Sequence, residues 1–287
     1  MSDFFAPGKL LLSGEYSVLQ GAKAIAVPTK MGQHLKASPN AADDLHYAAL
    51  DDKGQPWLNF LLSEAKSSEE CLVRDILLSA SKVSDLKGWS LETKLDFPRE
   101  WGLGSSSTFI ALIAQWSQKD VWPLFFNFLK GSGYDVAVAL AKTAIEYQLS
   151  DTQKPQWKSV QIPNFFAETG LMYLGKKQNS ALEVSRYLAS DHPTKLVQEI
   201  SQLSEDLLKL NDVQDLEAWM EEHERKTASL IGKPTIEESF RPIIEGKIKS
   251  LGAWGGDFVW LSRLDSADKL RSAGFNHIYT FKELVDH

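Results

Sequence analysis

A turn rich in glycine and serine, EWGLGSSSTFI at residues 100–110, follows a predicted strand and precedes a predicted helix. Gly102 and Gly104 permit positive φ angles and a close approach of the backbone to a ligand. The N–H groups that begin the helix attract anions, and the hydroxyls at 105–107 can bind phosphate oxygens or Mg²⁺. A serine cap on an ordinary helix explains the same residues. The turn therefore predicts either a phosphate cradle or a capped helix.

Three better-known loops do not match these residues. A Walker A loop requires a Lys directly after its last glycine, and none follows here. A dinucleotide-binding turn needs a third small residue where this chain has Ser107, and the strand before it, at 89–97, alternates instead of forming a buried run. A G-x-S-x-G nucleophile elbow is absent as well. None of these three loops therefore explains the turn.

The spacing of apolar residues predicts an α+β chain with a β-rich start and a helical second half. Short apolar runs broken by Gly and Pro predict strands joined by tight turns over 4–37. A Ser start and early acids predict a helix over 67–84. A polar, proline-bearing tract at 148–164 predicts a loose domain boundary. We expect further strands at 45–50, 89–97, 170–175 and 277–281, and further helices at 120–130, 135–144, 180–189, 194–210, 213–231, 235–250 and 266–274.

The composition narrows the classes of partner and the compartment. A net charge of -7 argues against a mainly electrostatic nucleic-acid or membrane-surface partner, so an anionic substrate needs a local basic pocket. The single Cys71 forms no intrachain disulfide and no export signal is visible, which predicts a cytoplasmic location. No segment approaches the roughly 20 apolar residues of a membrane span. The six histidines show no metal-ligand spacing, so no His/Cys metal site is expected.

Four glycine-bearing motifs follow one another along the chain: APGKLLLSGEYSVL at 6–19, GLGSSS at 102–107, GSGYDVA at 131–137 and GAWGGDFV at 252–259. Together they resemble the ordered motifs of the GHMP kinase superfamily, whose members phosphorylate small-molecule hydroxyls or acids with ATP. The resemblance spans residues 5–260. The GEY and GGD sequences make it most similar to the phosphomevalonate kinases of the mevalonate-pathway branch, and next to the mevalonate kinases.

This resemblance implies the two-domain α+β fold of the GHMP kinases. Residues 1–155 would form a β-rich, ribosomal-S5-like domain that binds ATP, and residues 156–287 a ferredoxin-like domain. The active site is expected in the cleft between the two domains.

The resemblance also implies roles for single residues. Asp135 matches the carboxylate that acts as base or orienting charge near the acceptor oxygen, and Lys9 matches the lysine beside it. Ser106 matches the ligand of Mg²⁺ and phosphate. Taken alone, Asp135 could be a helix cap and Lys9 a solvated strand end. The ATP triphosphate is expected along Gly102, Leu103, Gly104, Ser105, Ser106 and Ser107.

The acceptor side is less fully specified. The motifs imply a substrate pocket formed by Glu15, Tyr16, Ser132, Gly133, Gly255, Gly256 and Asp257. In the loop GAWGGD at 252–257, Trp254 replaces a small residue of the family. This bulk argues against close packing of the loop against the substrate. The family's Mg²⁺-binding Glu is missing, and Asp120 is a substitute or an exposed helix start. Basic side chains for an anionic acceptor could come from Lys9, Arg99, Lys142, Lys176, Lys177 and Arg186.

The sequence thus predicts Mg²⁺- and ATP-dependent phosphorylation of phosphomevalonate, in the pathway to isoprenoid precursors, by a monomer or homodimer. Mevalonate, or another small metabolite of this superfamily, is the alternative acceptor. The missing Glu and Trp254 motivate a different class of function, a GHMP-fold protein that binds nucleotide or metabolite without catalysis.

Overall fold

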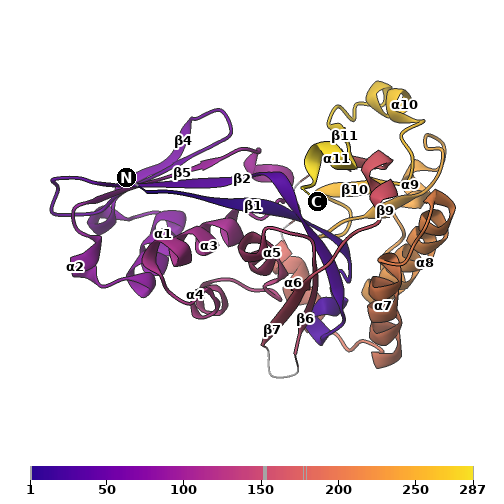
Figure 1. Ribbon diagram of the computed structural model, residues 1–287, viewed down its shortest axis with the longest axis horizontal. Helices are drawn as coiled ribbons and strands as arrows, with labels where there is room; N and C mark the ends of the chain where they lie inside the picture. The colour runs from indigo at the N-terminus through magenta and orange to yellow at the C-terminus, as the bar shows by residue number, and fades with distance from the viewer. Residues whose placement is uncertain (1, 151–153, 177, 179, 287) are drawn as a thin grey trace. The chain divides into compact units, whose positions relative to one another are not determined.

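The computed structural model describes residues 2–150, 154–176, 178 and 180–286, and it is a mixed α+β structure (Figure 1). The chain divides into two compact units. Unit 1 consists of Met1–Gly8, Met31–Arg99 and Leu103–Lys142, and unit 2 of Lys9–Lys30, Glu100–Gly102 and Thr143–His287. Both units are discontinuous because β1 (Ser2–Ser13) and β2 (Ala24–Pro39) contribute to each. The boundary after residue 155 remains a prediction.

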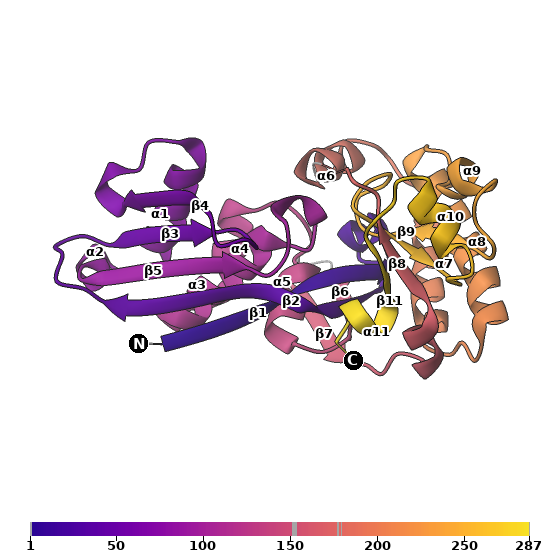
Figure 2. The same ribbon diagram turned by 90° about the horizontal axis from the view of Figure 1, so that it is seen from above.

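Unit 1 contains a sheet with the strand order β4-β3-β5-β2. Strand β3 (His46–Leu50) pairs antiparallel with β4 (Pro56–Leu61) and parallel with β5 (Trp89–Leu95). Alternate residues of β5 are buried, as the predicted half-buried strand requires. Figures 1 and 2 show α1, α3 and α4 on one face of this sheet. The apolar core of the unit therefore lies between the sheet and these helices.

Helices α1, α3, α4 and α5 of unit 1 begin close to the predicted starts, whereas the predicted helix over 67–84 ends at Ala80 and is followed by a separate short helix, α2. Ser67 and Glu70 form a capping box at the start of α1, because each side chain accepts a hydrogen bond from the other residue's backbone N–H. Residues 107–114 of α3 are all buried, so this helix forms the centre of the core. The helices of unit 1 are α1 (Ser68–Ala80), α2 (Val83–Leu86), α3 (Ser105–Ser117), α4 (Val121–Phe128) and α5 (Tyr134–Ala141), with a 3₁₀ turn at Leu62–Glu64.

Unit 2 contains a strand pair that the sequence analysis missed. Strand β6 (Ile145–Leu149) pairs antiparallel with β2 and with β7 (Pro155–Ser159). Strand β7 and the end of β6 lie in the polar tract that predicted a loose boundary. Four of the five residues of β7 are exposed, so the strand lacks the apolar alternation by which a strand is recognised.

A second, four-stranded antiparallel sheet in unit 2 has the order β11-β8-β10-β9. The predicted helix over 235–250 is wrong, since only α9 (Glu237–Phe240) is helical and the segment ends in a strand. Pro242 provides no N–H for a continuing helix. The strands are β8 (Gly170–Tyr173), β9 (Ile248–Ser250), β10 (Phe258–Leu261) and β11 (Ile278–Thr280).

Helices α6, α7, α8 and α10 of unit 2 agree with the predicted segments, whereas α11 was not predicted and begins at Phe281, the last residue of the predicted strand. Helices α7 and α8 lie side by side in both ribbon views (Figures 1 and 2). The helices are α6 (Ser180–Leu188), α7 (Thr194–Leu207), α8 (Val213–Ile231), α10 (Ala267–Ser272) and α11 (Phe281–Leu284), with 3₁₀ turns at Ser17–Gln20 and Asn164–Glu168. Another 3₁₀ turn, Arg99–Trp101, precedes the glycine-serine turn.

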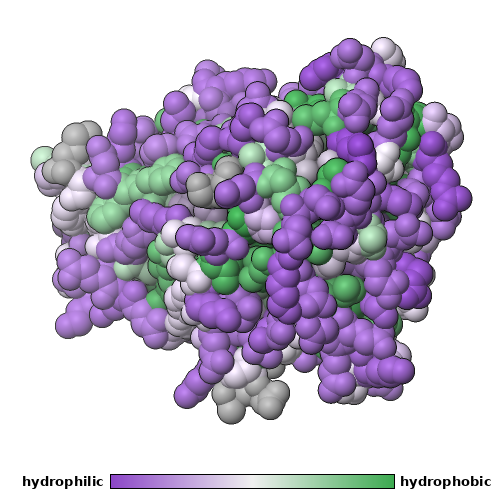
Figure 3. All heavy atoms as spheres, turned by 45° about the vertical axis from the view of Figure 1, so that its right-hand side comes forward, coloured by the Kyte–Doolittle hydropathy of each residue, from purple (hydrophilic) through white to green (hydrophobic). Residues whose placement is uncertain are grey.

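The surface agrees with the acidic, polar composition. The face drawn in Figure 3 is mainly hydrophilic, with apolar residues showing between polar ones. Among the described residues, no helix combines the length and the apolar character needed to cross a membrane.

Candidate functional site

Gly102 is in contact with two of the predicted site residues of unit 2. The Nζ of Lys9 donates a hydrogen bond to the Gly102 carbonyl oxygen at 2.8 Å. The carboxylate of Asp257 packs so closely that a Cβ at position 102 would lie 2.4 Å from it. Gly102 also has a φ of 68°, which disfavours any side chain. The structure therefore brings Lys9 and Asp257 together at the first glycine of the loop.

The glycine loop at residues 252–257, called the third glycine loop from here on, is held by the segment that follows β8. The Asp257 N–H donates to the carbonyl of Lys176 at 2.8 Å, and the Gln178 N–H donates to Asp257 Oδ1 at 3.3 Å. A Cβ on Gly256 would lie 2.2 Å from the side chain of Gln178. Asp257 itself has a φ of 52°, an uncommon conformation for a residue other than glycine. Both the glycine and the acid are thus fixed by close packing.

Trp254 does not fill the space beside the third glycine loop. Its indole is buried in an apolar cluster of unit 2 and donates Nε1–H to the carbonyl of Pro234 at 2.9 Å. Its backbone N–H donates to the hydroxyl of Tyr16 at 3.0 Å. Burial raises the pKa of Tyr16 to about 12. The bulk of Trp254 is therefore absorbed by the protein core, and Tyr16 holds the backbone of the loop.

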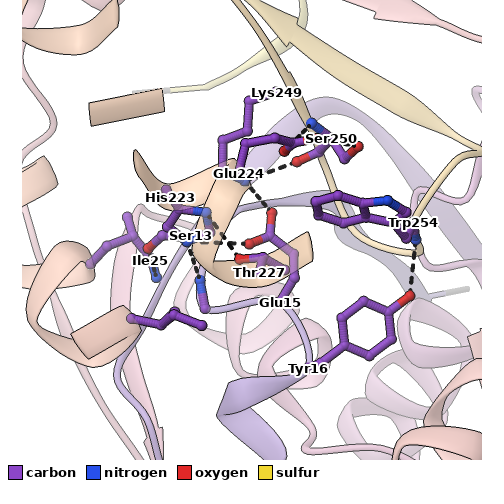
Figure 4. Close-up of polar contacts among 12 residues, drawn as sticks. Ser13, Glu15, Tyr16, Ile25, His223, Glu224, Thr227, Lys249, Ser250 and Trp254 are labelled. Atoms are coloured by element: carbon purple, nitrogen blue, oxygen red, sulfur yellow. Dashed lines mark hydrogen bonds and ion pairs between the residues drawn. The ribbon is translucent and has the colours of Figure 1, made fainter. Parts of the chain in front are cut away.

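Glu15 is part of a buried ionic cluster that the sequence analysis did not predict (Figure 4). Glu15 is 1% exposed and Lys249 is 0% exposed. The Nζ of Lys249 donates to Glu15 Oε1 at 2.5 Å and to the Ser250 carbonyl at 2.8 Å. Glu224 accepts the N–H of Ser250 at 3.0 Å. Burial raises the pKa of both Glu15 and Glu224, because it penalises the charged carboxylate.

His223 completes this cluster on the far side of Glu15. The Gly14 N–H donates to His223 Nε2 at 3.3 Å, so this nitrogen carries no proton. It lies 3.6 Å from Glu15 Oε2, which receives no hydrogen bond from the described residues. Burial and then the charge of Lys249 hold the pKa of His223 well below its usual value. The imidazole is therefore neutral at pH 7.

The glycine-serine turn and the second glycine turn meet inside unit 1. The hydroxyl of Ser107 donates a hydrogen bond to Asp135 Oδ2. Asp135 lies in the first turn of α5, and its Oδ1 accepts the N–H of Val136 at 3.0 Å. Gly133 begins that helix with a φ of 85° and packs against Trp122, and Ser132 before it is 4% exposed. Asp135 is thus a positioned carboxylate rather than a solvated helix start.

Neither a family model nor a curated protein sequence matches this chain. Solved structures do match it over nearly the whole length. A phosphomevalonate kinase from Streptococcus pneumoniae, in complex with phosphomevalonate and AMPPNP, has a TM-score of 0.72 at 18% identity and covers 97% of this chain and 99% of its own. A mevalonate kinase from Methanococcus jannaschii gives 0.69 at 18% identity and covers 97% and 96%. A Lactococcus lactis galactokinase with galactose gives 0.68 at 13% identity and covers 99% and 92%. This chain has the GHMP kinase fold.

The donor atoms at the start of α3 suit the metal that a GHMP kinase fold implies. Ser106 is exposed and Ser105 is half-buried, so neither residue is sealed in the core. The described residues contain no group of three or more His, Cys, Asp or Glu side chains that could hold a metal. Mg²⁺ requires no such cage, because it commonly binds one or two protein oxygens together with phosphates and water. The residues present therefore fit Mg²⁺ that arrives with a nucleotide.

The other predicted residues of this GHMP-fold chain are distributed more widely. Asp120 accepts the N–H of Trp122 at 3.2 Å and caps α4, which supports its interpretation as a helix start. Arg99 and Arg186 form ion pairs with Glu69 and Glu183 at 3.0 and 2.8 Å. Leu103 is 1% exposed and Gly104 caps α3 with a φ of 93°. Lys142 ends α5, and Lys177 lies outside the described residues.

Proposed function

We propose that this chain is an ATP-dependent kinase of a small anionic metabolite, with phosphomevalonate as its acceptor. The observation that carries the proposal is the hydrogen bond between Ser107 and Asp135. It joins the predicted phosphate loop to the carboxylate that the motifs predict at the acceptor. The shared fold and the four ordered motifs support a kinase, and the complex of the Streptococcus pneumoniae protein supports this acceptor.

Phosphoryl transfer requires positioning and charge neutralisation more than covalent chemistry from the protein. We propose that the glycine-serine turn at residues 102–107 binds the triphosphate through its backbone N–H groups and the hydroxyl of Ser105. Ser106 binds Mg²⁺, which neutralises phosphate charge when bound. Asp135 accepts the proton of the acceptor or orients its oxygen. Lys9 adds a positive charge, and its bond to Gly102 keeps the entrance of the loop in place.

In unit 1, the residues proposed to contact the acceptor are Ser132 and Gly133. In unit 2, Gly255, Gly256 and Asp257 keep the substrate-binding role that the motifs imply. We assign Glu15 and Tyr16 a structural role beside the substrate-binding residues. The side chain of Glu15 binds Lys249, and the hydroxyl of Tyr16 binds the backbone of Trp254. These hydrogen bonds fix the conformation of the loop that is proposed to contact the substrate.

One screen tests the proposal. Turnover with Mg·ATP is measured on phosphomevalonate, mevalonate, homoserine and galactose by ADP release. We expect phosphomevalonate to give the highest kcat/KM. Robust turnover of mevalonate with none of phosphomevalonate would reverse the order of acceptors. Binding of ATP without turnover of any acceptor would establish the non-catalytic alternative.

Asp135→Asn tests the role of the carboxylate. We expect kcat to fall by orders of magnitude while the affinity for ATP changes little, because the carboxylate acts at the acceptor. Steady-state kinetics and nucleotide titration measure the two quantities separately. Asp120→Asn, at an exposed helix cap, is the matched control and should retain kcat. A near wild-type kcat in Asp135→Asn would remove Asp135 from the mechanism.

A further inference from the structure

Ser107 differs from its two serine neighbours in what surrounds its hydroxyl. Ser107 is 4% exposed, whereas Ser106 is exposed and Ser105 is half-buried. Its hydroxyl donates to Asp135 Oδ2, on a helix that begins 27 residues further along the chain. The three serines of the motif therefore do not share one role.

Hydrogen-bond chemistry separates the roles. A serine hydroxyl has one proton to donate. A phosphate oxygen at neutral pH needs a donor, and the Ser107 proton is already directed at a carboxylate. Ser107 could offer a phosphate only its lone pairs, which repel phosphate oxygens. The side chain that the sequence motif groups with the phosphate ligands is thus unsuited to that task.

The surroundings make this contact rigid. Thr108, the next residue, donates its hydroxyl to the buried Gln33 of β2 at 2.7 Å, which fixes the first turn of α3 to the sheet. On the other side, Gly133 is held against Trp122 at the start of α5. Both carboxylate oxygens of Asp135 accept hydrogen bonds, from Ser107 and from the N–H of Val136. The Asp135 side chain is therefore confined to one orientation.

We propose that Ser107 is a positioning residue that orients the Asp135 carboxylate, and that it is not a phosphate ligand. This inference rests on the proposed function, in which Asp135 acts at the acceptor. In this proposal, two adjacent serines of the glycine-serine turn have different functions. Ser106 faces the nucleotide, and Ser107 aligns the group that activates the acceptor.

A double-mutant cycle tests the proposal with Ser107→Ala, Asp135→Asn and the double variant. We expect Ser107→Ala to lower kcat about tenfold or more, the size of a lost charge-assisted hydrogen bond, with KM for ATP changed less than about twofold. In the Asp135→Asn background the same substitution should change kcat little, because the oriented carboxylate is already gone. Ser117→Ala on the same helix, where the hydroxyl donates to Ile113 at 2.7 Å, is the control and should retain kcat.

The opposite pattern overturns the proposal. If Ser107 were a phosphate ligand, Ser107→Ala would raise KM for ATP, and it would do so equally in the wild-type and Asp135→Asn backgrounds. If the wild-type protein phosphorylates no acceptor, the proposed function fails by itself. Crystal structures of the wild type and Ser107→Ala still decide the inference in that case. Asp135 should leave its rotamer in the variant, and an unchanged rotamer would contradict the positioning role.

Discussion

At the scale of single residues, the ammonium of Lys249 decides whether unit 2 can tolerate its buried acids. Glu15 and Glu224 are both buried near it, and one oxygen of Glu15 receives no hydrogen bond from the described residues. Two charges in a low-dielectric interior are costly unless they compensate each other. The attraction between Lys249 and Glu15 therefore adds little to the free energy of unfolding. Removing one of the two partners, however, lowers it strongly, because the other charge stays buried without compensation.

Lys249→Met tests this view. We expect it to lower the free energy of unfolding by about 3–5 kcal/mol, because Glu15 is left as an uncompensated buried charge. The double variant Lys249→Met, Glu15→Gln should recover part of that loss. Urea denaturation measures all three proteins. Lys269→Met removes an exposed ion pair with Glu245 and should cost far less, because water screens that pair. Equal losses at the two lysines would contradict the argument.

At the scale of elements, the loop between Trp101 and α3 depends on the absence of a side chain at position 102. Gly102→Ala places a methyl group 2.4 Å from the Asp257 carboxylate and keeps the positive φ. We expect weakened ATP binding and a loss of about 1–3 kcal/mol in the free energy of unfolding. Nucleotide titration and urea denaturation measure these effects.

Gly255→Ala is the matched control for this prediction. Gly255 has a φ of 78°, but a Cβ there would meet nothing within 4 Å. Its substitution therefore carries the backbone strain without the collision. A Gly102→Ala variant no more impaired than Gly255→Ala would show that contact with Asp257 is unimportant.

The elements also show how far local signals reach. Helices α1 and α3 were predicted because Ser67, Glu70 and the glycine-serine turn act within a few residues of the helix start. The β6–β7 hairpin was missed because the exposed β7 lacks an apolar pattern. The contact between Ser107 and Asp135 could not be predicted from spacing, since it depends on how α3 packs on α5. The buried cluster that includes His223 and Lys249 could not be predicted for the same reason, because tertiary packing brings these residues together.

At the scale of the whole molecule, the buried imidazole of His223 makes stability depend on pH. Its pKa in the folded protein is well below 6.5, so the folded state binds fewer protons than the unfolded state as the pH falls below 6.5. The free energy of unfolding should therefore decrease on acidification below pH 6.5, by at most about 1.4 kcal/mol per pH unit for this one group. Glu15 and Glu224 act in the opposite direction, because their raised pKa values reduce stability as the pH rises above 4.5.

Comparison with His223→Gln isolates the histidine contribution. Urea denaturation at pH 5.5, 6.5 and 7.5 should show that the difference in unfolding free energy between wild type and variant shrinks toward low pH. His46→Gln, which changes a histidine hydrogen-bonded to Asn59 at 2.6 Å, is measured in parallel at the same pH values. A constant difference between wild type and His223→Gln would show that this imidazole does not titrate on unfolding.

The path of β1 and β2 through both compact units limits how this protein can be divided by recombination. A gene cut after codon 142 leaves all of unit 1 in the first fragment, but it separates residues 9–30 and 100–102 from the rest of unit 2. No single cut yields two fragments that each encode a complete unit. One crossover therefore cannot exchange a complete unit between two such genes.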